Sequence, residues 1–146
     1  MHPNIHVNFA AVLAAVVVTV AIGSAWYGPL FGKAWIKLAG VSAKKPNQSQ
    51  MMRSMVIMIV GAFLTAYVLS HTVQVWRPST WNSAWTDESP CIYGFFSGFF
   101  TWLGFYVPLL MGPVAWENKP WKLFWLNAGY YFVSLQAISM ILAYWP

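Results

Sequence analysis

Charged side chains are scarce in this sequence, at 8% of 146 residues. A soluble domain usually carries about 25% charged residues, so the chain lacks the polar surface that covers a globule in water. This shortage excludes a soluble enzyme, a nucleic-acid-binding domain and a disordered tail. The only carboxylates are Asp87, Glu88 and Glu117. Because all three lie in or next to loops, an acid/base site of paired carboxylates buried in a membrane is also excluded.

Cysteine is nearly absent as well, since Cys91 is the only one. A lone cysteine excludes an internal disulfide and every motif built on a pair of thiolates. The sequence contains no HExxH segment either. The remaining candidates for a zinc, copper or haem site are His2, His6 and His71, but Pro3 interrupts any helix that would bring the first two together. The sequence therefore predicts no cofactor.

Apolar residues, by contrast, make up 59% of the chain and aromatic residues 18%. Four long stretches carry no charged side chain, and each exceeds the roughly 20 residues that a helix needs to cross about 30 Å of hydrocarbon. Backbone groups in lipid must be satisfied within their own segment, which favours helices. The sequence predicts an all-α polytopic membrane protein, a single domain over residues 1–146 that forms a four-transmembrane-helix bundle. The predicted helices cover about residues 7–28, 52–75, 91–115 and 122–145. No basic residue precedes the first stretch, which favours a membrane helix over a cleaved signal peptide.

A short amphipathic helix is predicted after the first membrane helix, over about residues 30–39. Pro29 interrupts the first helix, and Phe31, Trp35 and Leu38 then recur at helical spacing. Lys33 and Lys37 fall on another face, and Gly40 is a typical C-terminal stop. This pattern indicates a helix that lies in the membrane interface. The residues predicted at that interface are Trp26, Lys33, Trp35 and Lys37.

The basic residues predict the orientation. Seven of the eight fall in the first and third loops, which places these loops in the cytoplasm and both termini outside. The expected location is the inner membrane of a bacterium. The remaining loop, residues 76–90, contains Trp76, Trp81 and Trp85, whose rings favour a membrane interface. Its further role stays open.

Several short motifs resemble one protein family. They are WYGPLFGKAW at Trp26–Trp35, WLGF at Trp102–Phe105, NAGY at Asn127–Tyr130 and VSL at Val133–Leu135. In this order and over nearly the whole chain, they resemble the domain-of-unknown-function 1761 family of small bacterial membrane proteins. The resemblance implies a four-helix membrane fold. It implies no activity, substrate or catalytic residue.

Small residues recur at helical intervals on two of the predicted helices. Because lipid gives no hydrophobic drive for helix association, small side chains promote it by allowing backbones to approach closely. The resulting face indicates either a packed pair of helices within the chain or a seam between two copies. The predicted packing residues are Ala11, Ala15, Gly23, Gly94, Gly98 and Gly104.

Polar side chains form two sets within the membrane, each spaced i, i+4, i+7. Tyr67, His71 and Gln74 share a face of the second helix, and Asn127, Tyr131 and Ser134 share a face of the fourth. Polar groups at this depth normally point into the bundle and bond across helices. The alternative is that they line a pocket for a small or amphipathic ligand.

These features favour a non-catalytic binding, scaffold or accessory subunit. Abundant aromatic side chains suit contact with the lipid bilayer and with other membrane subunits or a second copy, and no nucleic-acid partner is expected. One alternative is a homo-oligomeric small transporter or channel. A second alternative is a metal- or haem-binding membrane protein that uses His71.

Overall fold

The computed structural model describes residues 3–41 and 47–146, so that His2, Lys44 and Lys45 lie outside the described residues. Within these ranges, four spans are long and apolar enough to cross a membrane: Phe9–Leu30, Gln48–Val75, Pro90–Trp116 and Trp121–Tyr144. The prediction of an all-α polytopic membrane protein is therefore confirmed. The elements in chain order are α1 (Phe9–Ala25), η1 (Trp26–Leu30), α2 (Gly32–Ala39), α3 (Gln48–Val75), η2 (Pro78–Trp81), α4 (Pro90–Thr101), η3 (Trp102–Tyr106), α5 (Val107–Trp116) and α6 (Trp121–Tyr144).

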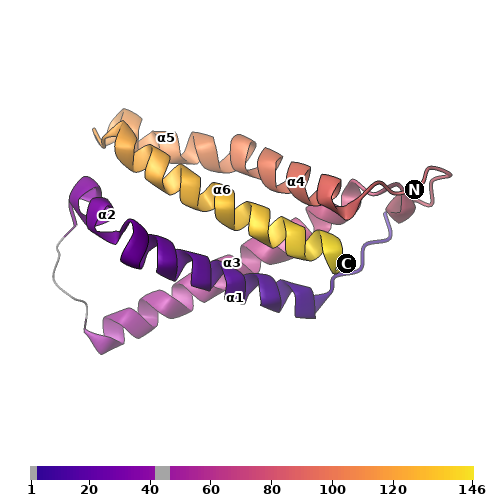
Figure 1. Cartoon of the computed structure of the whole chain (residues 1–146), viewed down its shortest axis with the longest axis horizontal. Helices are drawn as coiled ribbons and strands as arrows, with labels where there is room; N and C mark the ends of the chain where they lie inside the picture. Colours follow the sequence, from indigo (N-terminus) through magenta and orange to yellow (C-terminus); the bar gives the residue numbers. More distant parts are fainter. Residues whose placement is uncertain (1–2, 42–46) are drawn as a thin grey trace.

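Helix α6 is the centre of the bundle and contacts α1, α3 and α4. Figure 1 shows α6 between α1 and the α4–α5 span, with α3 crossing behind α1. The bundle has two ends. The α2 end carries α2 and the turn between α5 and α6, whereas the loop end carries both chain termini and the loop of residues 76–89.

Local sequence explains where the helices begin and end. The Asn8 side chain accepts hydrogen bonds from the amides of Ala10 and Ala11 and so caps α1. Asn47 and Gln50 form a reciprocal capping box at the start of α3. Gly40 ends α2 with a φ of 70°, a left-handed conformation that glycine adopts without steric cost. The predicted interfacial helix is thus present as α2. It starts at Gly32 because the π-helical turn η1, which contains Pro29, occupies the preceding residues.

The most tightly packed core lies in the half of the bundle nearest the loop end. Its fully buried side chains come from the first half of α1, the second half of α3 and the second half of α6. They include Val12, Leu69, Val73, Leu135 and Ile138. Because packing rather than water exclusion holds helices together in lipid, this half fixes the relative positions of α1, α3 and α6.

Hydrogen bonds close the loop end over that core. The Gln74 side chain accepts from the amide of His6 and donates to its carbonyl, so it holds the N-terminal segment in an extended conformation. The amide of Asn4 donates to the carbonyl of Thr80 at 2.8 Å, and the Thr80 hydroxyl donates to the carbonyl of Gln74 at 2.8 Å. The N-terminal segment is therefore part of the folded bundle.

The Trp-rich loop is itself folded. Trp81 turns back, and its Nε1 donates to the carbonyl of Val75 at 2.8 Å, whereas Trp76 and Trp85 are exposed. Asp87 accepts hydrogen bonds from the Ser79 hydroxyl at 2.7 Å and the Ser79 amide at 2.9 Å. The Ser79 hydroxyl, the Ser79 amide and the nearby positive charge of Arg77 hold the pKa of Asp87 below its usual value.

This contact predicts a pH dependence of the loop. A carboxylate with a lowered pKa stabilises the folded loop at neutral pH, and this contribution is lost only as the pH falls through the lowered pKa. We expect the Ser79 amide to stay protected from hydrogen exchange from pH 7 to pH 5 and to lose protection in stronger acid. The Thr80 amide, which donates to the carbonyl of Arg77, is the control and should keep its protection. Loss of Ser79 protection already at pH 5 would contradict the assignment.

Five of the six small residues predicted to pack are buried or lie close to another helix. Ala11 and Ala15 are fully buried, and a Cβ added to Gly23 would lie 3.1 Å from the Tyr130 hydroxyl. A Cβ on Gly94 would lie 3.2 Å from Met140 Cα, and one on Gly98 would lie 2.5 Å from Ser139 Oγ. The glycine face of α4 is thus covered by α6 of the same chain.

Gly104 differs from the prediction, because a Cβ there would meet no atom within 4 Å. The reason is the π-helical turn η3. A π turn adds a residue to the helical repeat, and this rotates Gly104 away from the bundle. Trp102 and Tyr106 take the inward positions instead, and Trp102 Nε1 donates to the carbonyl of Ala128 at 2.8 Å.

The first half of α3 stands apart from the bundle. Every residue from Gln48 to Gly61, a segment that we call the free half of α3, is exposed, and Figure 1 shows this part of the helix diverging from its neighbours at the α2 end. The second half of α3 supplies the buried residues, beginning at Ala62. The bundle is consequently packed at the loop end and open on one side toward the α2 end.

Candidate functional site

A cavity of about 300 Å³ lies where α3 leaves the bundle. Its walls come from α1, α3, η3 and α6, and we call it the tyrosine crevice. The lining residues are Thr19, Ile57, Met58, Gly61, Ala62, Thr65, Tyr106, Tyr130, Tyr131, Ser134, Leu135 and Ile138. A second cavity, of about 220 Å³, shares Thr19, Met58 and Ala62 with it and continues past Gly23 to Tyr27. The crevice thus follows α1 and α3 toward the α2 end.

Aromatic contacts build the polar wall of the crevice. The rings of Tyr106 and Tyr131 have centroids 4.6 Å apart, those of Tyr130 and Tyr131 are 5.0 Å apart, and those of Tyr27 and Tyr130 are 4.9 Å apart. These edge-on and tilted pairs are favourable ring geometries. The Tyr106 hydroxyl lies 3.4 Å from Thr65 Oγ1 on α3, which joins η3 to the opposite wall.

The hydroxyl of Ser134 is the unusual group in this wall. Ser134 is 3% exposed and lines the crevice. Among the described residues its Oγ makes no hydrogen bond within 3.5 Å, and the Tyr130 side chain is close enough to interact with it weakly. By contrast, the Thr19 hydroxyl donates to the carbonyl of Ala15 at 2.8 Å. Buried polar groups are almost always paired, so an unpaired hydroxyl that faces a cavity marks a position where a ligand atom can bind.

The crevice is polar but uncharged. Its lining residues include neither Lys, Arg and His nor Asp and Glu. The walls combine hydroxyl-bearing side chains with apolar ones, among them Ile57, Leu135 and Ile138. Such a surface can hydrogen-bond a neutral group but provides no counter-charge and no obvious acid or base.

A family match covers all four membrane spans of this architecture. The family described as "Protein of unknown function (DUF1761)" matches residues 10–143. The chain belongs to this family. The resemblance inferred from the sequence motifs is thereby confirmed. No curated protein and no solved structure matches the chain.

Two of the DUF1761 motifs contribute to the α2 end of the site. In the first, Trp26 Nε1 donates to the carbonyl of Leu126 at 3.2 Å, and the Tyr27 hydroxyl donates to Asn127 Oδ1 at 3.0 Å. Asn127 opens the NAGY motif, and a Cβ on Gly129 of the same motif would lie 3.3 Å from the Trp26 ring. The motifs therefore meet each other and pack α1 against α6.

This meeting gives Trp26 contacts within the bundle of this DUF1761 protein. The interfacial position predicted for it stays a prediction, and in the structure its ring contacts those of Phe31 and Tyr130. Trp35 is half-buried and contacts the Tyr27 ring edge-on at 5.6 Å. Lys33 and Lys37 remain exposed. Trp26 still has α-helical dihedral angles, and the chain kinks just after it at Gly28, which lets Phe31 fold back against the Trp26 ring.

The two polar sets predicted from helical spacing do not form one pocket. Ser134 and Tyr131 line the tyrosine crevice, and Asn127 lies just beyond it, bonded to Tyr27. Tyr67 and His71 line a separate surface groove on α3, and Gln74 points to the N-terminal segment instead. Helix α3 crosses its neighbours at an angle (Figure 1), so successive turns of one face meet different surroundings.

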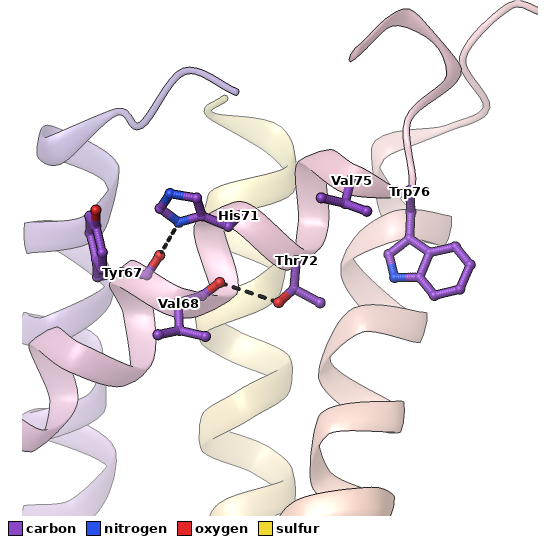
Figure 2. Close-up of a pocket in the computed structure, with 6 residues that line it drawn as sticks. All are labelled: Tyr67, Val68, His71, Thr72, Val75 and Trp76. Carbon is purple, nitrogen blue, oxygen red and sulfur yellow. Dashed lines mark hydrogen bonds between the residues drawn. The ribbon is translucent and has the colours of Figure 1, made fainter. Parts of the chain in front are cut away.

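The groove that contains His71 is drawn in Figure 2. Its volume is about 460 Å³, and its lining residues all come from one helix and the turn that follows it: Tyr67, Val68, His71, Thr72, Val75 and Trp76. His71 Nδ1 lies 2.9 Å from the carbonyl oxygen of Tyr67, and the Thr72 hydroxyl donates to the carbonyl of Val68 at 3.2 Å. Both polar side chains are thus bonded to their own helix.

Metal-ligating residues are dispersed in the described part of the chain. Residues 3–41 and 47–146 contain no group of three His, Cys, Asp or Glu side chains that could hold a metal ion. His6 bonds through its backbone to Gln74, and His71 is bonded to Tyr67. His2 lies outside the described residues.

Sequence reasoning missed four polar side chains of the crevice: Thr19, Thr65, Tyr106 and Tyr130. Tyr106 belongs to the π-helical turn η3, so a regular 3.6-residue repeat assigns it to the wrong face. The adjacent pair Tyr130–Tyr131 could have indicated this wall, because polar side chains within a membrane helix usually face the interior of the bundle.

Proposed function

We propose that this DUF1761 protein is a non-catalytic membrane subunit that binds a transmembrane helix of another protein along the free half of α3. The observation that carries the proposal is the exposure of every residue from Gln48 to Gly61. The docking face comprises Met52, Val56, Ile59 and Val60, which are 42–58% exposed. These residues lie on the opposite side of α3 from Met58, Ala62 and Thr65, which line the crevice.

Helix packing supports a protein partner over lipid. Interhelical contacts fix helix positions in a bilayer, whereas no residue in the free half of α3 is buried by its own bundle. Four of the seven methionines in the chain lie there, at Met51, Met52, Met55 and Met58. Methionine side chains adapt to irregular surfaces and are frequent at binding surfaces. A partner helix would supply the missing contacts.

The basic residues at the α2 end favour a different protein, and not a second copy of this chain, as the docking partner. The α2 end carries Lys33, Lys37, Arg53, Lys119 and Lys122. The same end has a single carboxylate, Glu117. Two copies docked side by side through α3 would bring like charges together, which is unfavourable. We therefore propose a partner with acidic residues near the membrane surface at this end.

The same basic residues support an orientation. Lys and Arg are concentrated in cytoplasmic loops of membrane proteins. We propose that the α2 end is cytoplasmic, that both termini and the Trp-rich loop are outside, and that the protein lies in a bacterial inner membrane. The acidic partner surface is then cytoplasmic too.

Photo-crosslinking from the docking face tests the proposal. A benzophenone amino acid placed at Val56 should give one discrete adduct with another membrane protein, and mass spectrometry should place the link in a transmembrane helix. The same amino acid at Leu109, which is 73% exposed on α5, is the matched control and should give no discrete protein adduct.

Two results would contradict this function. An adduct at twice the mass of the chain would show self-association in place of a different partner. Equal labelling at positions 56 and 109, or lipid adducts at both, would show that the free half of α3 is an ordinary lipid-facing surface.

A further inference from the structure

We propose that the tyrosine crevice binds the small, uncharged, oxygen-bearing head group of a membrane-dissolved amphiphile, whose apolar tail passes between α3 and its neighbouring helices into the lipid. The crevice volume of about 300 Å³ is at the small end of the range for ligand pockets, roughly 300–1,000 Å³. The space suits a head group rather than a whole lipid. This site is distinct from the docking face on the other side of α3.

Ser134 supplies the hydrogen bond that the ligand completes. Its Oγ is buried, faces the crevice and has no partner among the described residues. The neighbouring hydroxyls of Tyr106, Tyr130 and Tyr131 border the same space. A carbonyl, ester or hydroxyl oxygen of a ligand can accept from Ser134, and this contact removes the cost of an unpaired buried donor.

The absence of charge in the lining selects a neutral head group. A carboxylate, phosphate or ammonium group in this crevice would lose its hydration without gaining a counter-charge. The aromatic rings of Tyr106 and Tyr131 offer flat apolar surfaces beside the hydroxyls, which suit a planar or ester-bearing group. Quinone rings and diacylglycerols share this chemistry.

The position of α3 gives such a ligand a route from the bilayer. The crevice wall on α3 consists of Ile57, Met58, Gly61, Ala62 and Thr65, of which the first three belong to its free half. A Cβ added to Gly61 would meet no atom within 4 Å, so the space beside it is open. A tail can therefore leave the crevice sideways between α3 and its neighbours without crossing water.

Binding of defined probes to the purified full chain in nanodiscs tests this inference. The probes are a decyl-substituted benzoquinone, dioctanoylglycerol, decanoate and decane, and native mass spectrometry measures their dissociation constants. We expect saturable binding of at least one of the two neutral oxygenated probes, and at least tenfold weaker binding of decanoate and of decane. A comparison of the affinities for the quinone and for the glycerol ester shows which of these two ligand classes the crevice binds.

Two serine variants provide a matched pair. Ser134→Ala should weaken binding of the neutral probe about fivefold, which corresponds to one lost neutral hydrogen bond. Ser97→Ala is the control, because the Ser97 hydroxyl is also buried and unpaired but does not line the crevice. Its affinity should not change. Ala62→Leu narrows the crevice and should weaken binding further, with circular dichroism used to verify that it folds.

Three results would overturn the inference: binding of decane as tight as that of the oxygenated probes, tight binding of decanoate, or an unchanged affinity in Ser134→Ala. A Val56→Trp variant separates this site from the proposed function. That substitution should abolish binding of the partner protein and leave the probe affinity unchanged.

Discussion

Replacing Gly98 by leucine is expected to lower the free energy of unfolding by about 3 kcal/mol, the upper part of the usual range for an overpacked core. A Cβ there would lie 2.5 Å from Ser139 Oγ and 3.1 Å from the carbonyl oxygen of Leu135. The second of these atoms belongs to the backbone of α6 and cannot rotate away. Helix α4 must therefore move off α6, with loss of packing along the interface between them. Unfolding in detergent mixtures with increasing SDS, followed by circular dichroism, measures the change.

Gly104→Leu is the matched control for this prediction. Gly104 lies in the same membrane span, but a Cβ on it would meet no atom within 4 Å. Its substitution should change the free energy of unfolding by no more than about 0.5 kcal/mol. A similar loss in both variants would indicate that leucine disturbs this span wherever it is placed and would contradict the assignment of the α4–α6 contact.

Replacing Arg77 by alanine is expected to cost about 2 kcal/mol, within the range for hydrogen bonds of charged groups. The Arg77 guanidinium donates to the carbonyl of Ala143 near the C-terminus of α6 and lies 5.7 Å from the centroid of the Tyr93 ring on α4. It thus joins the ends of α3, α4 and α6, and its positive charge interacts favourably with the negative end of the α6 dipole. Its Nε is buried and has no partner among residues 3–41 and 47–146. The variant therefore also removes one unpaired donor, which keeps the loss of stability below the upper end of that range.

Arg53→Ala is the control for charge removal. Arg53 is exposed on the free half of α3, so its loss should leave the stability of the isolated protein within about 0.5 kcal/mol of the original. The same SDS titration compares the two variants. If Arg53→Ala destabilises as much as Arg77→Ala, net charge rather than the contact with Ala143 controls stability.

The membrane spans could be predicted from the sequence because each depends on local composition alone. Uncharged apolar runs of sufficient length dictate helices in lipid. The short helix α2 was equally accessible, since Gly40 supplies a left-handed stop that is independent of tertiary contacts. The family motifs independently implied the same four-helix fold, and the match to the family over residues 10–143 confirms the resemblance.

The composition of the crevice could not be predicted from helical spacing. Spacing placed Tyr67 and Gln74 on one face, but the crossing angle of α3 takes the first to a surface groove and the second to the N-terminal segment. The π-helical turn η3 changed the phase of its helix, which brought Tyr106 inward and turned Gly104 outward, and the first membrane span kinks at Gly28. These features depend on how helices pack together, and a periodic pattern within one helix does not record them. Of the residues predicted to be polar contacts, Tyr131 and Ser134 lie in the crevice.

Native mass spectrometry of the protein released directly from membranes is the most direct test of the central claim, that the free half of α3 docks another membrane protein. We expect the chain to appear in complex with one other membrane protein. Val56→Trp should release it as the single chain, because a bulkier side chain disrupts the packed docking face. Leu109→Trp, on the exposed surface of α5, should leave the complex intact. Detection of the unaltered chain only alone, or only as copies of itself, would contradict the account.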